Sequence, residues 1–302
     1  MMHYTPLRYP GGKAKLYKFF CGLIENNFTD APNYAEPYAG GAGLALALLM
    51  TGKVKKIYIN DIDRAIYAFW YTLLNETDRL IDKIKTVNVS LEEWDKQHLI
   101  QGNKETADIF DLGFSTFFLN RTNRSGIIKG GMIGGRGQNG VWKLDARFNK
   151  TNLISRIKAI ADYRLYINIS NIDALQFLRN MGNTGTMNTL YYLDPPYIKK
   201  ATGLYSHSYG DADHIKVAKT VKTLDAKWIV SYDAENIVEK LYSGYRQITY
   251  DLGYSARTAR TGREFMAFSV DLKIPEEIQQ AKKNISIPNM SNIIFCNLNN
   301  MI

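Results

Sequence analysis

Cysteine is scarce in this sequence. Cys21 and Cys296 are its two cysteines, too few and too far apart for a disulfide framework or for a zinc or iron site. The longest apolar run, residues 42–50, is too short to cross a bilayer, and the N-terminus has no apolar stretch of signal-peptide length. These absences argue against a disulfide-stabilised secreted protein and a membrane-spanning one. They predict a cytoplasmic protein that binds no metal.

Acidic residues are outnumbered by basic ones. The chain of 302 residues has 38 Lys and Arg against 29 Asp and Glu, a formal net charge of +9 and an isoelectric point near 9.3. Such a charge favours a polyanionic partner, nucleic acid above all, although a basic enzyme without such a partner has the same totals. The apolar fraction of 45% is ordinary for a globular protein, and the length suffices for one large domain or two.

Short apolar strands alternate with helical patterns along most of the chain. The strands end at about residues 36, 60, 170, 193 and 233, and two further strands near 245–254 and 263–272 form a candidate hairpin. Helical patterns such as "ADHIKVAKTVKTLD" lie between most of them. This alternation predicts a Rossmann-like α/β fold with a mostly parallel, doubly wound sheet.

The alternation stops between about residues 64 and 156. The chain there is helical and then glycine-rich, in "SGIIKGGMIGGRGQNG". We therefore expect an inserted, mainly helical domain at 64–156 within a domain made of 1–63 and 157–275. The tail at 276–302 is Asn-rich and weakly patterned, and we assign it no role.

Three strand ends carry groups suited to a nucleotide-like ligand. The segment "EPYAGGAG", Glu36 to Gly43, is a glycine-rich turn after the first strand, where a ligand can approach the backbone. It lacks the GxGxxG spacing of diphosphate sites. Asp61 after the second strand suits ribose hydroxyls, and Asp173 after the third suits an adenine amine. A tight turn and two helix caps are the alternatives, and Asp63 is a further candidate cap.

The most specific motif is "DPPY", Asp194 to Tyr197, at the end of the fourth strand. An exocyclic base amine is a poor nucleophile because its lone pair is conjugated into the ring. The Asp194 carboxylate and the Pro195 carbonyl can accept its two hydrogens, and two prolines hold both acceptors in place before reaction. Tyr197 offers a face on which the base can stack. The alternative is a strand-ending turn whose Asp caps and whose Tyr packs.

Basic residues gather in three loops. In "LRYPGGK" at 7–13, Lys13 could meet a carboxylate and Tyr9 a sulfonium cation. In "FFLNRTNRSG" at 117–126, Arg and Asn suit phosphates and base edges, and the glycine-rich stretch that follows could be a mobile basic hairpin. "GYSARTARTGRE" adds Arg257, Arg260 and Arg263. Solvated loops are the alternative in each case.

Six motifs, "RYPGGK", "EPYAGGAG", "YINDID", "FFLNRTNRSG", "NID" and "DPPY", occur in this order over about residues 5–270. In this set and order the chain resembles the DNA adenine methylase (Dam) family of N6-adenine DNA methyltransferases. The resemblance implies S-adenosyl-L-methionine as cofactor, an insert that recognises double-stranded DNA, and methyl transfer to N6 of an adenine flipped out of the duplex. Arg124 and Ser125 stand where GATC methylases carry Tyr-Asn before glycine, so GATC specificity is not implied.

The expected site residues follow from these motifs. The catalytic set is Asp194, Pro195, Pro196 and Tyr197. The cofactor-binding set is Tyr9, Lys13, Glu36, Pro37, Tyr38, Gly40, Asp61 and Asp173. The DNA-binding set is Asn120, Arg121, Arg124, Ser125, Lys129 and Arg136. We expect a monomer or weak dimer, and no metal. An N4-cytosine or RNA methyltransferase and a non-catalytic DNA-binding regulator remain as alternatives.

Overall fold

The computed structural model describes residues 4–9, 13–183, 188–198, 209–254, 260–275 and 291–295. Within them, eight strands form one sheet in the order β3-β2-β1-β4-β5-β7-β6-β8. The strands are β1 (Asn33–Glu36), β2 (Ile57–Asn60), β3 (Ile167–Ser170), β4 (Thr189–Leu193), β5 (Lys227–Asp233), β6 (Arg246–Tyr254), β7 (Arg260–Phe268) and β8 (Ser291–Phe295). Strands β1 to β5 are parallel and β7 is antiparallel to both neighbours, so the expected Rossmann-like sheet and its hairpin are confirmed.

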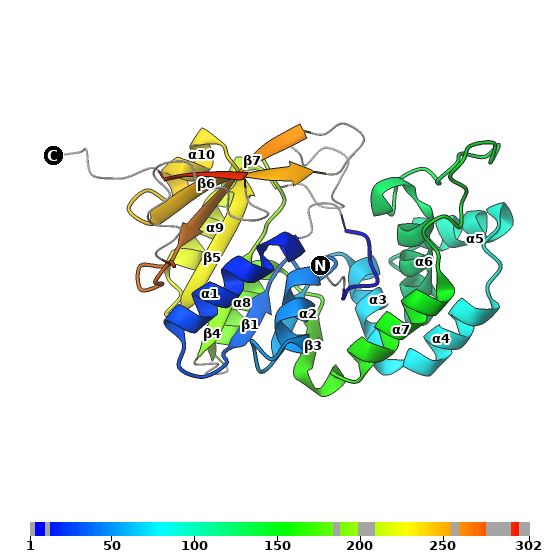
Figure 1. The fold of residues 1–302 in the computed structure, drawn as a ribbon, viewed down its shortest axis with the longest axis horizontal. Coiled ribbons are helices and arrows are strands. Elements are labelled where there is room, and N and C mark those ends of the chain that lie inside the picture. The colour runs from blue at the N-terminus through cyan, green and yellow to red at the C-terminus, as the bar shows by residue number, and fades with distance from the viewer. Residues whose placement is uncertain are drawn as a thin grey trace.

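Helices cover both faces of the sheet (Figure 1). A short 3₁₀ turn η1 (Lys13–Leu16), α1 (Tyr17–Asn27) and α2 (Gly43–Met50) pack with one hydrophobic cluster; α8 (Ala174–Asn183), α9 (Asp211–Lys222) and α10 (Asn236–Leu241) pack with the other. Neighbouring side chains of β4 alternate between the clusters, Tyr192 in the first and Tyr191 and Leu193 in the second. All five residues of β4 are buried, which is why its sequence is a continuous apolar run.

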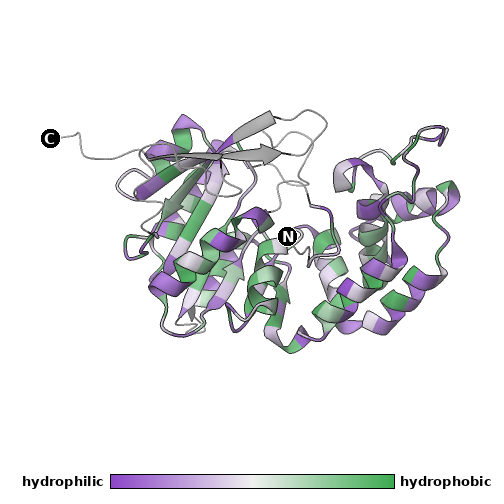
Figure 2. Cartoon of the chain, in the orientation of Figure 1, coloured by the Kyte–Doolittle hydropathy of each residue, from purple (hydrophilic) through white to green (hydrophobic). Residues whose placement is uncertain are grey.

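The segment between β2 and β3 is helical and lies beside the sheet (Figure 1). It comprises α3 (Arg64–Asn75), α4 (Thr77–Thr86), α5 (Leu91–Gly102), α6 (Ile109–Thr122), the 3₁₀ turn η2 (Arg124–Gly126), α7 (Lys150–Ala161) and the 3₁₀ turn η3 (Arg164–Tyr166). A Cβ on Gly113 of α6 would lie 2.5 Å from the carbonyl oxygen of Ala68 in α3, so glycine permits the close approach of these two helices. Hydrophobic residues dominate α2, whereas the helices between β2 and β3 carry a mixture of hydrophobic and hydrophilic residues (Figure 2).

Residues 4–9, which we call the N-terminal strap, contact the helical segment between β2 and β3. The Arg8 amide donates to Asn120 Oδ1 at 2.7 Å, and Asn120 Nδ2 donates back to the Arg8 carbonyl at 2.9 Å. Arg156 of α7 donates to the Thr5 carbonyl at 3.1 Å. A Cβ on Gly126 would lie 2.0 Å from the Arg8 carbonyl oxygen, and Gly126 has a φ of +76°, so only glycine fits there.

The Asn-rich tail supplies an element that its sequence did not indicate. Strand β8 pairs antiparallel with β6 at the edge of the sheet. Such an edge strand depends mainly on backbone hydrogen bonds, which leave no clear side-chain pattern. In the described part of the chain, no helix is long and apolar enough to cross a membrane.

Candidate active site

Asp194 lies directly after β4, at the point where the strand order reverses between β1 and β4. Ligands of open α/β sheets bind at this crevice. Ser231 of β5 donates from Oγ to Asp194 Oδ1 at 2.8 Å, and Lys13 donates from Nζ to Asp194 Oδ2 at 2.6 Å. Ser231 Oγ also lies 2.8 Å from the Tyr192 hydroxyl. The carboxylate is therefore held at both oxygens, and its side chain remains 22% exposed.

Tyr197 and Lys13 form a second, deeper part of this site. Lys13 Nζ donates to the Tyr197 hydroxyl at 2.7 Å, and that hydroxyl donates to Glu264 of β7. Burial and the nearby charge of Asp194 raise the pKa of Tyr197 well above its usual value. The Tyr197 residue is 4% exposed, so its ring is covered in this structure.

The glycine-rich turn and the N-terminal strap meet at Gly40 and Tyr9. Gly40 has a φ of +48°, and a Cβ on it would lie 2.6 Å from the Tyr9 ring. Trp70 of α3 donates from Nε1 to the Gly40 carbonyl at 2.9 Å. The turn is thus fixed from two sides and admits no side chain at Gly40.

The two acids after β2 have different surroundings. Asp61 accepts from the Gly40 amide at Oδ2 and from the Asp63 amide at Oδ1, both at 2.9 Å. Burial raises the pKa of Asp61 to about 6, although these two N–H groups oppose the shift. Asp63 caps α3 and forms an ion pair with Lys104 at 3.1 Å. Each Asp61 oxygen has a second lone pair, so this carboxylate can still accept from ribose hydroxyls.

The other expected cofactor residues line the same sheet edge. Asp173 is exposed and caps α8, accepting from the amides of Leu175 and Gln176 at 3.0 and 3.1 Å, both through Oδ1. The Tyr38 hydroxyl lies 3.3 Å from that of Tyr209. Pro37 presents its carbonyl to Asn60 Nδ2 at 3.0 Å.

Glu36 is buried at the end of β1. It accepts from the Tyr34 hydroxyl at Oε1, at 2.9 Å. Burial raises the pKa of Glu36 to about 8, and the charge of Asp194 adds to the rise. The raised pKa favours the protonated form of Glu36, and that form places no second negative charge beside Asp194.

Three supporting residues were not among the expected site residues. Ser231 stands in the buried strand β5, and Glu264, the last residue of "GYSARTARTGRE", is buried on β7. Asn60 ends β2, and its amide joins three strand ends. Asn60 Nδ2 donates to the carbonyls of Pro37 and Ile172 at 3.0 and 2.9 Å, and its Oδ1 accepts from the Ser170 hydroxyl at 2.8 Å.

The expected DNA-binding residues separate into buried and exposed groups. Asn120 is 1% exposed, and its amide bonds the backbone of Arg8 and Gly126, so in this structure it is unavailable to DNA. Arg121 is half-buried, with its Nε donating to the Arg147 carbonyl at 2.7 Å. The exposed members are Arg124, Ser125, Lys129 and Arg136.

The glycine-rich stretch has internal bonds that its composition did not indicate. Asn123 and Met132 form an antiparallel bridge at its base. Gln138 Nε2 donates to the Ile133 carbonyl at 2.9 Å, and Gln138 Oε1 accepts from the Leu144 amide at 2.8 Å. Arg136 forms a two-point ion pair with Asp95, at 2.5 and 3.0 Å. These bonds give the loop a definite shape.

Two of the basic segments fall only partly within the described residues. Arg257, like Pro10, Gly11 and Gly12 of "RYPGGK", lies outside them. Arg260 begins β7, and Arg263 is exposed on that strand. Among the residues that the structure describes, no group of three or more His, Cys, Asp or Glu side chains could hold a metal ion.

Comparison with known proteins identifies the family. The model of the D12 class N6 adenine-specific DNA methyltransferases matches residues 9–254. The type II methyltransferase M.MjaIII of Methanocaldococcus jannaschii is 25% identical over 274 residues, covering 79% of this chain and 88% of the relative. The type II methyltransferase M.CviBI of Paramecium bursaria Chlorella virus NC1A is 21% identical over 260 residues, covering 85% and 94%.

Similarity to solved structures is remote. The rRNA methyltransferase aviRa of Streptomyces viridochromogenes superposes over 89% of both chains with 11% identity and a TM-score of 0.40, too low to carry an argument. The strand order is more informative, because 3-2-1-4-5-7-6 with an antiparallel β7 is typical of S-adenosylmethionine-dependent methyltransferases.

The residues at the sheet edge fit that cofactor. S-adenosyl-L-methionine carries a sulfonium cation, a ribose and an adenine. Glycine at position 40 lets the turn pass close to the Tyr9 ring, which is an aromatic face suited to a cation, and Asp61 retains acceptor capacity for ribose hydroxyls. Family, fold and cofactor thus agree with the expectations from the sequence: the chain belongs to the D12 class of N6 adenine-specific DNA methyltransferases.

Proposed function

We propose that the turn Asp194–Tyr197 holds the N6 amine of an adenine that has left the duplex. The observation that carries this proposal is the fixed carboxylate of Asp194, held by Ser231 at 2.8 Å and by Lys13 at 2.6 Å. Asp194 and the Pro195 carbonyl accept the two amine hydrogens, which draws the nitrogen lone pair out of conjugation with the ring. Pro196 keeps the turn rigid, and Tyr197 provides the stacking face.

Lys13 has to share Asp194 with the incoming amine. In the structure its ammonium bonds both Asp194 and Tyr197. We propose that adenine displaces Lys13 from Asp194 Oδ2 and that Lys13 keeps its contact with Tyr197. Lys13 would then balance the carboxylate charge while the pocket is empty. After methylation the amine proton leaves to water.

Cofactor binding is assigned to the neighbouring strand ends. Tyr9 and Gly40 form the cradle, Asp61 accepts from the ribose, and Asp173 accepts from the cofactor's adenine amine. Glu36, Pro37 and Tyr38 shape the turn that carries them. When bound there, S-adenosyl-L-methionine supplies an activated methyl group, and the chain's own residues orient the amine that receives it.

The partner of the insert at 64–156 is double-stranded DNA. A base atom cannot react inside the stack, so the enzyme must extract the target nucleotide. We propose that Arg124, Ser125, Lys129 and Arg136 contact DNA directly. Asn120 instead positions the strap, because the oxygen and the nitrogen of its side-chain amide both bond the backbone of the chain.

Context and assembly follow as further parts of the proposal. The two relatives are named as type II methyltransferases, which favours a restriction–modification role for this chain. We also propose a monomer or weak dimer acting on DNA in the cytoplasm; light scattering with and without duplex DNA tests the assembly state.

One experiment tests the function. The pure protein is incubated with unmethylated plasmid DNA and S-adenosyl-L-methionine, the DNA is digested to nucleosides, and methylated bases are identified by mass spectrometry. We expect N6-methyladenine. N4-methylcytosine would overturn the target, and the absence of any methylated base would favour an RNA substrate or a DNA-binding regulator.

A further inference from the structure

Four arginines from distant parts of the chain converge where the N-terminal strap crosses the insert. We call this group the arginine cluster: Arg8 of the strap, Arg121 in the last turn of α6, Arg147 before α7, and Arg156 in α7. Three of the four side chains bond backbone carbonyls of the strap or of the insert. Arg121 donates from Nε to the Arg147 carbonyl at 2.7 Å and from Nη1 to the Pro6 carbonyl at 3.5 Å.

The remaining two are anchored in the same way. Arg8 donates from Nη1 to the Asn123 carbonyl at 3.1 Å, and Arg156 donates from Nη1 to the Thr5 carbonyl at 3.1 Å. All these acceptors are neutral carbonyls. Among the ion pairs formed between described residues, none includes a member of the cluster.

The cluster therefore concentrates positive charge without a counter-charge from the described chain. Burial and the charges of Arg8, Arg156 and Arg147 lower the pKa of Arg121 to about 10. Burial and the charge of Arg147 also lower the pKa of Arg8. Repulsion of this kind is relieved when an anion binds among the guanidinium groups.

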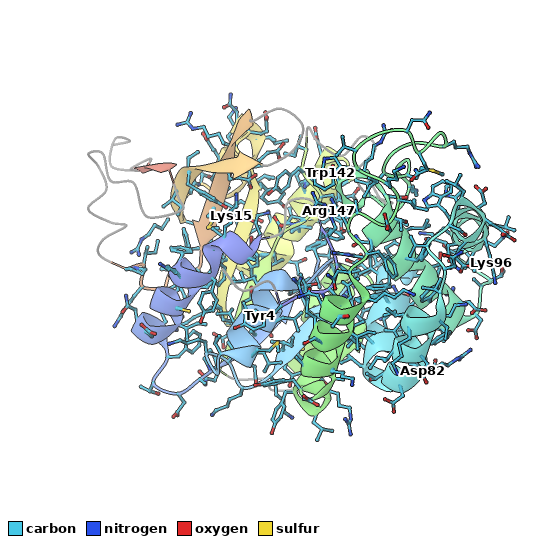
Figure 3. The ribbon with its side chains drawn as sticks, turned by 45° about the vertical axis from the view of Figure 1, so that its right-hand side comes forward. Tyr4, Lys15, Asp82, Lys96, Trp142 and Arg147 are labelled. Carbon is cyan, nitrogen blue, oxygen red and sulfur yellow. The ribbon has the colours of Figure 1, made fainter. Side chains whose placement is uncertain are left out.

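Arg147 is the most accessible member. It is exposed, and its guanidinium carbon lies 5.1 Å from the centroid of the Trp142 ring, beside which Figure 3 draws it. Trp142 is itself 62% exposed, on the loop that Gln138 holds together. The indole orients the guanidinium toward solvent in advance, so little order has to be gained when a ligand arrives.

We propose that the arginine cluster binds a phosphodiester group of the DNA backbone and so sets the position of the duplex relative to the catalytic pocket. This proposal rests on the proposed function. Each guanidinium has five N–H donors. Arg8 and Arg156 each use one of them in the bonds described above and Arg121 uses two, which leaves donors whose fork geometry matches phosphate oxygens. The contact carries no base information.

The location gives the phosphate contact a consequence for catalysis. Arg8 stands five positions before Lys13 in the sequence, and Lys13 bonds the catalytic Asp194 at 2.6 Å. The strap that carries Arg8 is also bonded to Asn120 in the insert. A phosphate held by the cluster is thus fixed to the segment that leads into the active site.

Substitution of Arg147 tests the proposal. Arg147→Gln removes one exposed guanidinium, whereas Arg164→Gln removes an exposed one at the opposite end of α7, away from the cluster. Dissociation constants are measured for two unrelated duplexes between about 50 and about 200 mM salt. For Arg147→Gln we expect equal weakening for both duplexes and a slope of log K against log salt shallower by about 0.9. Arg164→Gln should match wild type, and Arg147→Lys should keep the slope.

The outcomes separate this proposal from the function on which it rests. If Arg147→Gln binds with wild-type affinity and slope while wild type methylates adenine, the phosphate site is overturned and the function stands. Weakening confined to one duplex, with the slope unchanged, would assign Arg147 to base reading and also overturn it. A wild type that neither binds nor methylates any duplex overturns both.

Discussion

The candidate active site around Asp194 and the arginine cluster differ in how their charged groups are paired. In the pocket, Asp194 is paired with Lys13, and Glu264 accepts from Tyr197. In the cluster, the guanidinium groups of Arg8, Arg121 and Arg156 are held by neutral carbonyls, and that of Arg147 lies 5.1 Å from the centroid of the Trp142 ring. Charges paired in advance keep a fixed geometry, whereas charges without an ion-pair partner among the described residues are suited to a partner that brings the opposite charge. The difference matches the roles proposed above, methyl transfer at Asp194 and DNA capture at the cluster.

We expect the largest effect when the paired charge of Asp194 is removed from the candidate active site. Asp194→Ala deletes the acceptor for the adenine amine, and we expect methylation to fall by about a thousandfold or more, measured by transfer of labelled methyl groups to DNA. Cofactor affinity by calorimetry should stay close to wild type, since Asp61, Gly40 and Tyr9 are intact. Full activity of this variant would remove the proposed mechanism.

Gly40→Ala attacks the neighbouring cofactor cradle without changing any charge. The new Cβ would lie 2.6 Å from the Tyr9 ring at a φ of +48°, so the turn must shift. We expect cofactor affinity to fall by roughly a hundredfold, or about 2.7 kcal/mol. Gly52→Ala is the matched control, because Gly52 has a φ of +70° with nothing within 4 Å, and it should change stability alone. Equal losses in both variants would point to general strain.

The pH dependence of cofactor affinity is expected to be a smaller effect, and it belongs to the candidate active site rather than to the arginine cluster. Burial raises the pKa of Asp61 to about 6. Protonation below that pH removes its capacity to accept from both ribose hydroxyls, so cofactor affinity should fall as the pH drops from 7 to 5, by at most about tenfold per pH unit. Asp61→Asn should bind weakly at every pH, with a flat profile across this range. A sloping profile in Asp61→Asn would assign the titration to another group.

Much of the pocket was predictable because its residues follow buried strands. The continuous apolar run of β4 and the two prolines after it placed Asp194 at the sheet edge, and the same logic placed Asp61 after β2. Asp173 was expected either to cap a helix or to bind a ligand, and it caps α8 through one oxygen. Ser231 and Glu264 escaped prediction because the sequence around a single polar strand residue does not indicate which side chain it will contact.

The cluster was less predictable because it depends on contacts between distant segments. The net charge of +9 indicated a polyanion but could not place its site. Arg147 and Arg156 lie in no motif, and they approach Arg8 only because α7 packs beside the strap. Asn120 shows the converse. Its motif suggested a base contact, yet the fold buries its amide against Arg8 and Gly126.

The strap makes the proposed DNA-recognition module discontinuous in sequence. An insert taken from a relative would have to provide partners for the backbone of Thr5, Pro6 and Arg8, which Arg156, Arg121 and Asn120 provide here. In a chimaera that exchanges residues 64–156 alone, the contacts between the strap and the insert would be mismatched a few residues from Lys13. Retargeting this enzyme by module exchange therefore calls for transplanting residues 4–9 together with the insert, as one inherited unit.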